Sequence, residues 1–360
     1  MSKIDNEYYH HPALLYDRLD DEKNSVICRL CSHYCEIKDG NIGICLLRKN
    51  IGGELFTMTW GRTEGLAIDP IEKKPFYHFK PSSKVLSFGT PGCNFRCMNC
   101  QNWQLSQSVR YYSDKALANK VFLPEHVAEY ASIHKVDGIS YTYSEPTIFF
   151  EYARDTILEC RKNKQTESLF HVFVSNGYFT KEAVELMDRE NLLSALNIDL
   201  KFMDEHKYKK IAGGTLEPVL DSIKRIYDLR DKIHLEIINL VIPGENDNEE
   251  DFEKLCDFIV SVSPDIPLHF SRFHPHYKLS NKPPTELNTL INAKEIAHNK
   301  GIKFIYIGNT NIPGAEDTYC PKCKELLIAR NRYGIIQNNL NVANDKHKCP
   351  KCEEEIGIIL

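Results

Sequence analysis

Short apolar runs rich in β-branched and aromatic residues alternate along the middle of the chain with longer amphipathic segments. The apolar runs predict strands at 85–88, 139–143, 169–174, 195–200, 235–242, 268–271 and 302–307. The amphipathic segments predict helices at 125–134, 147–160, 181–189, 216–229, 249–262 and 287–299. This alternation predicts βαβ crossovers and a parallel sheet buried on both faces. We favour a full or partial barrel over an open, doubly wound sheet.

Two cysteine-rich segments flank this alternating region. Residues 1–80 carry short strand-like runs broken by glycines, residues 81–312 carry the alternation, and residues 313–360 have a cysteine pair at each end. We therefore expect a small N-terminal cysteine-rich domain, a central α/β domain and a short C-terminal module.

Composition and charge narrow the class of protein. The 360 residues are 42% hydrophobic and 26% charged, as in ordinary globular proteins. A net charge of -5 gives no field that would attract a polyanion, so we expect no nucleic-acid partner. The first twenty residues contain no apolar targeting segment, and no run approaches the roughly 18 apolar residues that a membrane span needs. We expect a cytoplasmic protein with no membrane association.

Cysteine is the informative residue type. Eleven of the thirteen cysteines fall into three tight groups, and only Cys160 and Cys256 stand alone within apolar-periodic segments. We interpret these two as buried small hydrophobic residues without a chemical role. Cytosolic thiols stay reduced, and thiolates close together in one loop can bind one metal centre. The grouping therefore predicts three metal centres.

The middle group consists of three cysteines in one loop. Cys93, Cys97 and Cys100 follow the first predicted strand, at the end of the sheet where α/β folds place their chemistry. A structural zinc site uses four ligands, so three leave a position open. A four-iron, four-sulfur cluster with three cysteines would have one iron free to bind substrate. The alternative is an incomplete zinc site that borrows a histidine.

The Cys-x3-Cys-x2-Cys spacing resembles the signature of the radical S-adenosylmethionine (SAM) superfamily. Residues 90–103, 141–147 and 199–201 further resemble the branch of pyruvate formate-lyase activating enzymes, and more narrowly the AmmeMemoRadiSam-system radical SAM proteins. The resemblance implies a partial (β/α)6 radical SAM barrel. It also implies an enzyme whose 4Fe-4S cluster cleaves SAM reductively to a 5'-deoxyadenosyl radical, which abstracts a hydrogen from a substrate. The implied partners are an electron donor such as flavodoxin or ferredoxin, and Memo- and AMMECR-domain proteins.

The resemblance also assigns SAM contacts at the ends of the second and third predicted strands. Ser144 and Glu145 occupy the place of the family's Gly-Gly-Glu-Pro turn, where the glutamate can accept from the methionine amino group. Ser144 departs from the family because it replaces a glycine. Ser175 and Asn176 follow the third strand and form either a SAM contact or an ordinary turn.

Asp199 and Lys201 end the fourth predicted strand on one face, within an apolar run. Buried opposite charges are costly unless they are paired or bind a ligand. The family uses this pair for the ribose and carboxylate of SAM, and a purely structural ion pair is the alternative. Asn99 stands where many members have an aromatic residue against the adenine, so Phe95 or Trp103 could take that role.

Polar residues on the fifth and sixth strands are weaker candidates. His274 and His276 leave the sixth strand toward the expected active face, where they could line a substrate pocket, bind a metal or form a turn. The same two strands also carry Glu236, Asn239 and Arg272. Residues 71–79 precede the barrel, and similar runs occur in the resembled family.

The C-terminal cysteines form two Cys-Pro-Lys-Cys turns. Such paired turns direct four thiolates to one tetrahedral ion, as in a zinc ribbon. The four ligands, Cys320, Cys323, Cys349 and Cys352, leave no open position, so we predict structural zinc, with rubredoxin-type iron as the alternative. A segment this short needs such a metal for stability.

The N-terminal cysteines form a second complete quartet, Cys28, Cys31, Cys35 and Cys45. Structural zinc and a second iron-sulfur cluster both suit this spacing. We favour zinc slightly, because the short loop contains glycines as metal-knuckle turns do.

Three function hypotheses follow. The first is a radical SAM enzyme acting on a small molecule, a peptide or a protein. The second is an activase that generates a glycyl radical on another protein, although no ferredoxin-like cysteine insert follows Cys100. The third is a non-catalytic metal-rich binding or electron-transfer protein, which the three-ligand loop disfavours because an electron carrier would close its cluster with four cysteines.

Overall fold

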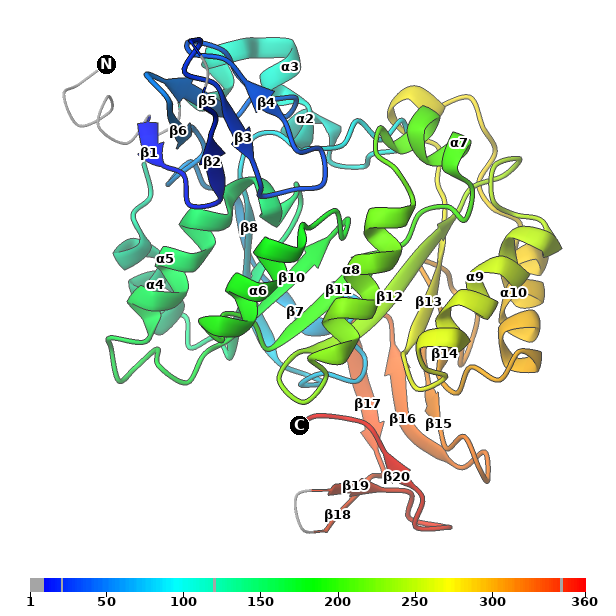
Figure 1. The fold of residues 1–360 in the computed structure, drawn as a ribbon. Coiled ribbons are helices and arrows are strands. Elements are labelled where there is room, and N and C mark those ends of the chain that lie inside the picture. The colour runs from blue at the N-terminus through cyan, green and yellow to red at the C-terminus, as the bar shows by residue number, and fades with distance from the viewer. Residues whose placement is uncertain (1–9, 21, 119–120, 344–345) are drawn as a thin grey trace.

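The computed structural model describes residues 10–20, 22–118, 121–343 and 346–360. The first nine residues, part of the segment expected to lack a targeting signal, lie outside the described residues. Eight strands form the central sheet in the order β14-β13-β12-β11-β10-β9-β8-β7 (Figure 1). These strands are β7 Glu64–Pro70, β8 Lys84–Gly89, β9 Gly138–Tyr141, β10 Phe170–Ser175, β11 Ala195–Asp199, β12 His234–Val241, β13 Leu268–Arg272 and β14 Ile305–Gly308.

The strands from β8 to β14 pair in chain order and run parallel, as the alternating pattern predicts. The expected all-parallel sheet is wrong at one edge, because β7 pairs antiparallel with β8. Only the short η2 (Ile71–Lys73) interrupts their connection, and antiparallel strands need no crossover helix. The edge strands β7 and β14 do not pair with each other, so the sheet is an open, partial barrel.

Helices follow the parallel strands and cover the outer face of the sheet (Figure 1). They are α4 Pro124–Ile133, α5 Phe150–Cys160, α6 Lys181–Arg189, α8 Glu217–Asp228, α9 Glu249–Val262 and α10 Leu287–Asn299. Thr180 caps α6 by accepting from the Ala183 amide, and Asn248 caps α9 by accepting from the Asp251 amide. With these caps, α6 and α9 begin and end at the residues that the pattern predicts.

The N-terminal segment folds into two small antiparallel sheets beside the barrel (Figure 1). Their strands are β1 His11–Pro12, β5 Arg48–Ile51 and β6 Glu54–Thr57, and β2 Tyr16–Arg18, β3 Val26–Cys28 and β4 Glu36–Ile37. Arg48 joins this unit to α5 through two hydrogen bonds to Glu151, at 2.8 and 2.6 Å, and both side chains are fully buried. The predicted boundary at residue 80 stays a prediction, and β7 from that segment is part of the central sheet.

The C-terminal segment forms two further three-stranded sheets below the barrel (Figure 1). Their strands are β15 Thr318–Tyr319, β16 Leu326–Asn331, β17 Gly334–Asn338, β18 Asn341–Ala343, β19 Lys346–Lys348 and β20 Glu355–Ile356. A small apolar core shared with Phe304 and Tyr306 attaches this module to the barrel. Arg330 adds a 2.8 Å hydrogen bond to the Tyr77 carbonyl.

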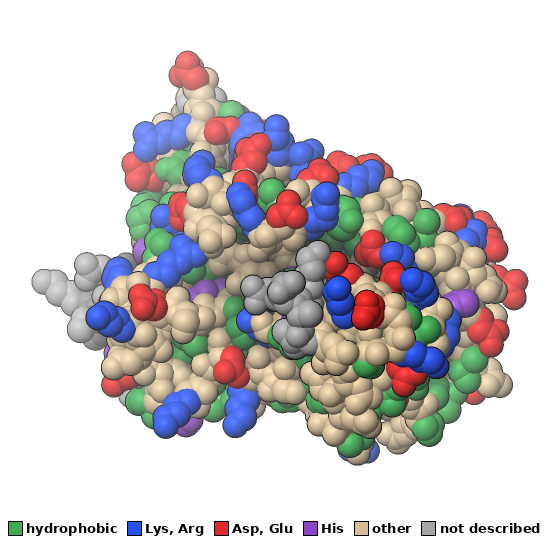
Figure 2. All heavy atoms as spheres, turned by 90° about the horizontal axis from the view of Figure 1, so that it is seen from below, with side chains coloured by type: hydrophobic (Ala, Val, Ile, Leu, Met, Phe, Trp, Pro, Cys, Tyr) green, Lys and Arg blue, Asp and Glu red, His purple; other side chains and the backbone are tan. Residues whose placement is uncertain are grey.

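The face seen from below carries Lys and Arg side chains interspersed with Asp and Glu (Figure 2). Among the described residues, no helix combines the length and apolar character required to cross a membrane.

Candidate active site

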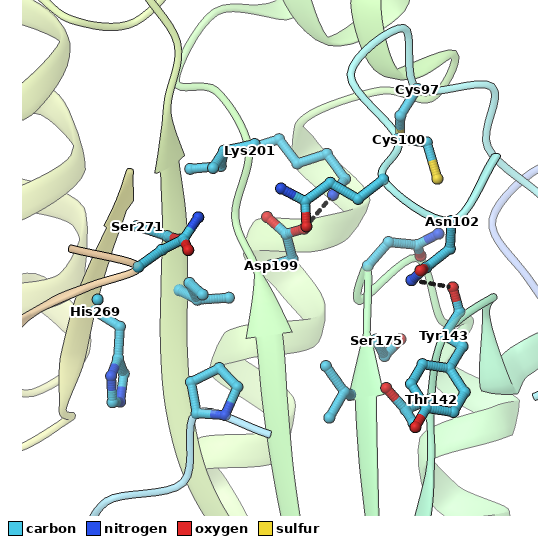
Figure 3. Close-up of a pocket in the computed structure, with 18 of the residues that line it drawn as sticks. Cys97, Cys100, Asn102, Thr142, Tyr143, Ser175, Asp199, Lys201, His269 and Ser271 are labelled. Carbon is cyan, nitrogen blue, oxygen red and sulfur yellow. Dashed lines mark hydrogen bonds and ion pairs between the residues drawn. The ribbon is translucent and has the colours of Figure 1, made fainter. Parts of the chain in front are cut away.

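A cavity of about 390 Å³ opens at the carboxyl ends of the parallel strands (Figure 3). Successive strand ends contribute to its wall, the position at which parallel α/β folds gather functional groups. These contributions include Thr142, Ser175, Asp199, Leu240, Ser271 and Gly308.

The three-cysteine loop forms one wall of this cavity. Cys93, Cys97 and Cys100 all line it, and the loop runs from β8 to α2 (Trp103–Ser106). Burial raises the pKa of the Cys97 thiol to about 12 and also raises that of Cys100. The Ser106 hydroxyl lies 3.2 Å from the Cys100 sulfur.

Backbone hydrogen bonds hold this loop to η5, a π-helical turn over Tyr208–Ala212. The Arg96 amide donates to the Ala212 carbonyl at 2.8 Å, and the Met98 amide donates to the Ile211 carbonyl at 2.9 Å. Irregular helical turns of this kind are frequent at functional sites because they re-aim backbone groups.

The buried side chain of Phe95 anchors the three-cysteine loop. Its ring is fully buried, between Tyr178 and Tyr208, and a Cβ at Gly214 would overlap it. Gly214 is therefore a packing requirement for the loop, which the cysteine spacing alone does not reveal.

Asp199 and Lys201 form an ion pair at the end of β11, as their shared face allows. Figure 3 shows the pair beside Cys97 and Cys100. Burial alone would lower the pKa of the Lys201 ammonium, but Asp199 and Cys97 hold it above its usual value. Asp199 Oδ1 is buried and has no hydrogen-bond partner. Asn239 supports this strand end by donating to the Leu200 carbonyl at 2.7 Å.

Glu145 is buried among donors of its own chain. Its Oε1 accepts from the Thr147 amide, the Thr147 hydroxyl and the Ser175 hydroxyl, and its Oε2 accepts from the Asn176 amide at 2.8 Å. Burial raises the pKa of Glu145, and these hydrogen bonds oppose the rise. The carboxylate thus fixes the 175–176 turn, and Oε2, with one donor, is the oxygen with capacity for another. The Ser144 hydroxyl is 3.3 Å from the Thr90 amide and ties the turn to the cysteine loop.

Tyr143 is a cavity residue that the sequence analysis missed. Its φ of +65° lies in the left-handed region that favours glycine. The Tyr143 hydroxyl donates to Asp69 at 2.8 Å, and the Lys74 ammonium lies 4.5 Å from the ring centre. Asn102 donates to the Tyr143 carbonyl at 3.0 Å. The sequence gives no local signal for these contacts of Tyr143, because Asp69 and Lys74 lie far away in the sequence. Only its position next to Ser144 and Glu145 could have marked Tyr143 as a site residue.

Residues of the 71–79 segment and of the C-terminal module also line the cavity. The segment contributes Glu72, Lys73, Pro75 and Tyr77, and the module contributes Glu316 and Tyr333. Glu236, fully buried, accepts from the Tyr77 amide at 2.9 Å and the His78 amide at 2.8 Å. Burial alone would raise the pKa of Glu236, but His234 and His269 lower it. The weak candidate Glu236 therefore positions this segment.

His274 and His276 are not among the cavity-lining residues. His274 is exposed and His276 is half-buried, so the geometry does not support the substrate-pocket interpretation of either. Of the two aromatic candidates for adenine, Phe95 lines the cavity, whereas Trp103 stacks on Tyr277 at 5.1 Å outside it. Arg272 donates to the Thr285 carbonyl, away from the cavity.

The C-terminal quartet has the geometry of a single-ion site. The Cys320 and Cys352 sulfurs are 3.6 Å apart, and the Cys323 and Cys349 sulfurs are 3.5 Å apart. Tetrahedral zinc with Zn–S bonds of about 2.3 Å brings sulfurs to about 3.8 Å from one another. Burial alone would raise the pKa of Cys349, but backbone amides of Lys351 and Cys352 lower it to about 7. The quartet can bind a metal ion.

Comparison with known proteins identifies the class. The family described as the Radical SAM superfamily matches residues 88–259, which span the cysteine loop and the ends of β8 to β12. The uncharacterized protein MJ0808 of Methanocaldococcus jannaschii is 41% identical over 351 residues, which cover 97% of this chain and 99% of that protein. The chain belongs to the radical SAM superfamily and is an enzyme of this type.

The particular relatives with printed activities are more distant. Pyruvate formate-lyase-activating enzyme of Staphylococcus epidermidis is 21% identical over 193 residues, covering 51% of this chain and 71% of that protein. Among solved structures, a domain of the same enzyme from Bacteroides vulgatus matches 48% of this chain and 99% of that chain, with 19% identity and a TM-score of 0.40. A radical SAM methyltransferase of Sphaerobacter thermophilus matches 70% of this chain and 71% of that chain, with 12% identity and a TM-score of 0.48.

Proposed function

We propose that this enzyme binds a 4Fe-4S cluster through Cys93, Cys97 and Cys100 and uses it to cleave SAM, generating a radical that abstracts hydrogen from a polar substrate. The observation that carries the proposal is the shared cavity. Three thiols, with no fourth cysteine in the cavity wall, face the same space as the Asp199 and Lys201 pair.

The residues present fit a cluster and SAM. Three cysteine ligands leave one iron of a cubane cluster open for a further ligand. Two buried oxygens in the cavity wall, Asp199 Oδ1 and Asn99 Oδ1, have no hydrogen-bond partner. A buried acceptor without a donor is unfavourable, so hydroxyl or amino groups of a bound ligand would stabilise both.

When bound, the cluster supplies the electron that splits SAM into methionine and a 5'-deoxyadenosyl radical. The chain supplies position and charge. The Lys201 ammonium is suited to the methionine carboxylate, and Asp199 Oδ1 is suited to accept from a ribose hydroxyl. Glu145 Oε2 has capacity to accept from the methionine amino group while Oε1 holds the neighbouring turn.

The substrate would contact cavity residues outside the cysteine loop. Glu72, Lys73, His269, Glu316 and Tyr333 contribute charges of both signs and hydrogen-bonding groups to the cavity wall. These groups suit a zwitterionic or polar small molecule, or a short peptide segment, better than an apolar one. Because Glu316 and Tyr333 come from the C-terminal region, that region contributes to specificity.

An activase that forms a glycyl radical on a protein is the second candidate. The similarity to pyruvate formate-lyase-activating enzymes over half of the chain favours it. A protein substrate would have to insert a loop into the cavity past the N-terminal and C-terminal units that flank the barrel.

The test is to reconstitute the full chain anaerobically with iron and sulfide, add SAM and dithionite, and quantify 5'-deoxyadenosine. The proposal expects product from the wild type. An intact cluster on the three cysteines that gives no 5'-deoxyadenosine would contradict it. Deuterium transfer into 5'-deoxyadenosine from deuterated cell extract, separated into small-molecule and protein fractions, then distinguishes the two candidate substrates.

A further inference from the structure

The N-terminal quartet surrounds a small pocket of its own. Cys28, Cys31, Cys35 and Cys45 all line it. The other lining residues are mainly aliphatic, namely Leu30, Ile37, Gly43, Ile44, Arg48, Thr147 and Ile148. Four thiols that converge on an apolar, largely buried space are a built metal site rather than scattered cysteines.

The spacing of these thiols differs from that of the C-terminal quartet. Within the described ranges, the C-terminal cysteines are the single group of three or more potential ligands whose atoms all lie within 4.8 Å of one another. No three sulfurs of the N-terminal quartet therefore meet this limit. A zinc ion would draw its sulfurs to about 3.8 Å from one another.

The central loop shows the same wide spacing. Cys93, Cys97 and Cys100 also fall outside the 4.8 Å limit, although they carry the cluster signature of the superfamily. A four-iron cubane places iron and sulfide between its thiolates and so keeps them farther apart than a single ion does. The N-terminal quartet thus shares a spacing wider than this limit with the loop proposed to hold the catalytic cluster.

A buried donor without a partner also lines this pocket. Arg48 lines the same pocket and is 2% exposed, with its terminal nitrogens on Glu151 and its Nε–H without a partner. An inorganic sulfide or a thiolate would give this donor an acceptor.

We propose that Cys28, Cys31, Cys35 and Cys45 hold a second four-iron, four-sulfur cluster, rather than the zinc ion that the short loop suggested. All four irons would have a cysteine ligand, so this cluster has no open position for substrate. Its binding loop packs against the central one, since His33 Nε2 lies 2.9 Å from the Asn94 carbonyl.

The test is a triple variant, Cys93→Ala with Cys97→Ala and Cys100→Ala, purified anaerobically as the full chain. We expect it to retain about four irons and about four acid-labile sulfides per chain. Relative to the wild type, sulfide should fall two-fold, with zinc unchanged at one ion per chain. A folded triple variant that contains two zinc ions and no sulfide would overturn the proposal.

Two further variants make the result specific. Adding Cys28→Ala and Cys31→Ala to the triple variant should remove the remaining sulfide, whereas adding Cys160→Ala and Cys256→Ala should leave it unchanged. Should the triple variant not fold, the wild type decides: about eight sulfides per chain support the second cluster and about four contradict it. These counts are independent of SAM cleavage, so they distinguish failure of this inference from failure of the proposed function.

Discussion

The central loop and the C-terminal quartet both offer cysteine sulfurs, but for different functions. In the C-terminal quartet, four sulfurs lie within 4.8 Å of one another. In the central loop, three sulfurs lie wider apart and face a cavity of about 390 Å³. The number of cysteines and the space beside them, rather than the residue type, separate a structural metal site from a reactive one.

The two regions also differ in what holds them in place. The C-terminal quartet belongs to a small apolar core, shared with Phe304 and Tyr306, that includes Cys320 and Cys349. The central loop has no separate core and takes its shape from η5, Phe95 and Gly214. Loss of a ligand should therefore affect folding in the first region and chemistry in the second.

The largest effect that this comparison predicts is on Cys97. Cys97→Ala removes a cluster ligand, and we expect 5'-deoxyadenosine formation to fall by more than about 10³-fold with little change in thermal stability. Product by mass spectrometry and the apparent Tm are the measurements. The control is Cys256→Ala, a buried lone thiol, which should retain product. A Cys97→Ala protein with a lower apparent Tm and unchanged 5'-deoxyadenosine formation would contradict the assigned difference between the two regions.

The converse variant is Cys320→Ser. It opens the C-terminal site, and loss of a structural metal ranks among the most destabilising single changes, at about 4 kcal/mol or more. We expect a lower apparent Tm and one metal ion fewer per chain, while SAM cleavage measured below the new Tm persists. Unchanged stability and metal content would show that the quartet is not a structural site.

A smaller effect is expected at Asp199. Asp199→Asn keeps the shape but removes the charge that pairs with Lys201 and the strongest acceptor at Oδ1. A lost hydrogen bond to a charged group corresponds to about 1.5–3 kcal/mol, so half-maximal SAM concentration should rise about ten- to one-hundred-fold. The matched control is Asp265→Asn, in an exposed pair with Lys303 at 2.6 Å. An equal half-maximal SAM concentration in both variants would show that Asp199 does not bind SAM.

The last effect, which is small per pH unit, concerns pH at the junction between barrel and module. Burial lowers the pKa of His78 from 6.5 to about 3, against Glu236, which raises it. Below pH 6.5, His78 therefore binds a proton in the unfolded chain but stays neutral in the folded chain. The free energy of unfolding decreases as pH falls from 6.5 toward 3. The contribution of His78 is at most about 1.4 kcal/mol per pH unit.

Urea unfolding at several pH values checks this expectation. His78→Gln should flatten the dependence of the free energy of unfolding on pH in that window. His171, whose pKa burial also lowers to about 3, stays in both proteins and supplies part of the remaining slope. An unchanged slope in His78→Gln would place the acid sensitivity elsewhere.

Much of the barrel follows from local pattern. α6, α9 and α10 occupy the predicted residues, because strong periodicity coincides with clear ends and, for α6 and α9, with side-chain caps. The edge strand β7 escaped prediction because its half-exposed, glycine-containing run has no strand pattern and its pairing with β8 is tertiary.

The site divides in the same way. The cysteine spacing and the shared face of Asp199 and Lys201 are local features, and the sequence displays both. The hydrogen bond from Tyr143 to Asp69 joins segments that are distant in the sequence. The part of the cavity wall that Glu316 and Tyr333 form also depends on such tertiary contact.

His274 and His276 follow the end of β13 but do not line the cavity. The segment after β13 packs against the cysteine loop instead, where the Lys278 amide donates to the Met98 carbonyl at 3.0 Å.

The most direct test of the central claim is the electron paramagnetic resonance spectrum of the dithionite-reduced full chain with and without SAM. The account predicts that SAM alters the signal of the cluster on Cys93, Cys97 and Cys100, because its open iron gains a ligand, and that the Cys97→Ala protein shows no SAM-dependent change. A wild-type spectrum with this cluster present that SAM leaves unaltered would contradict the claim.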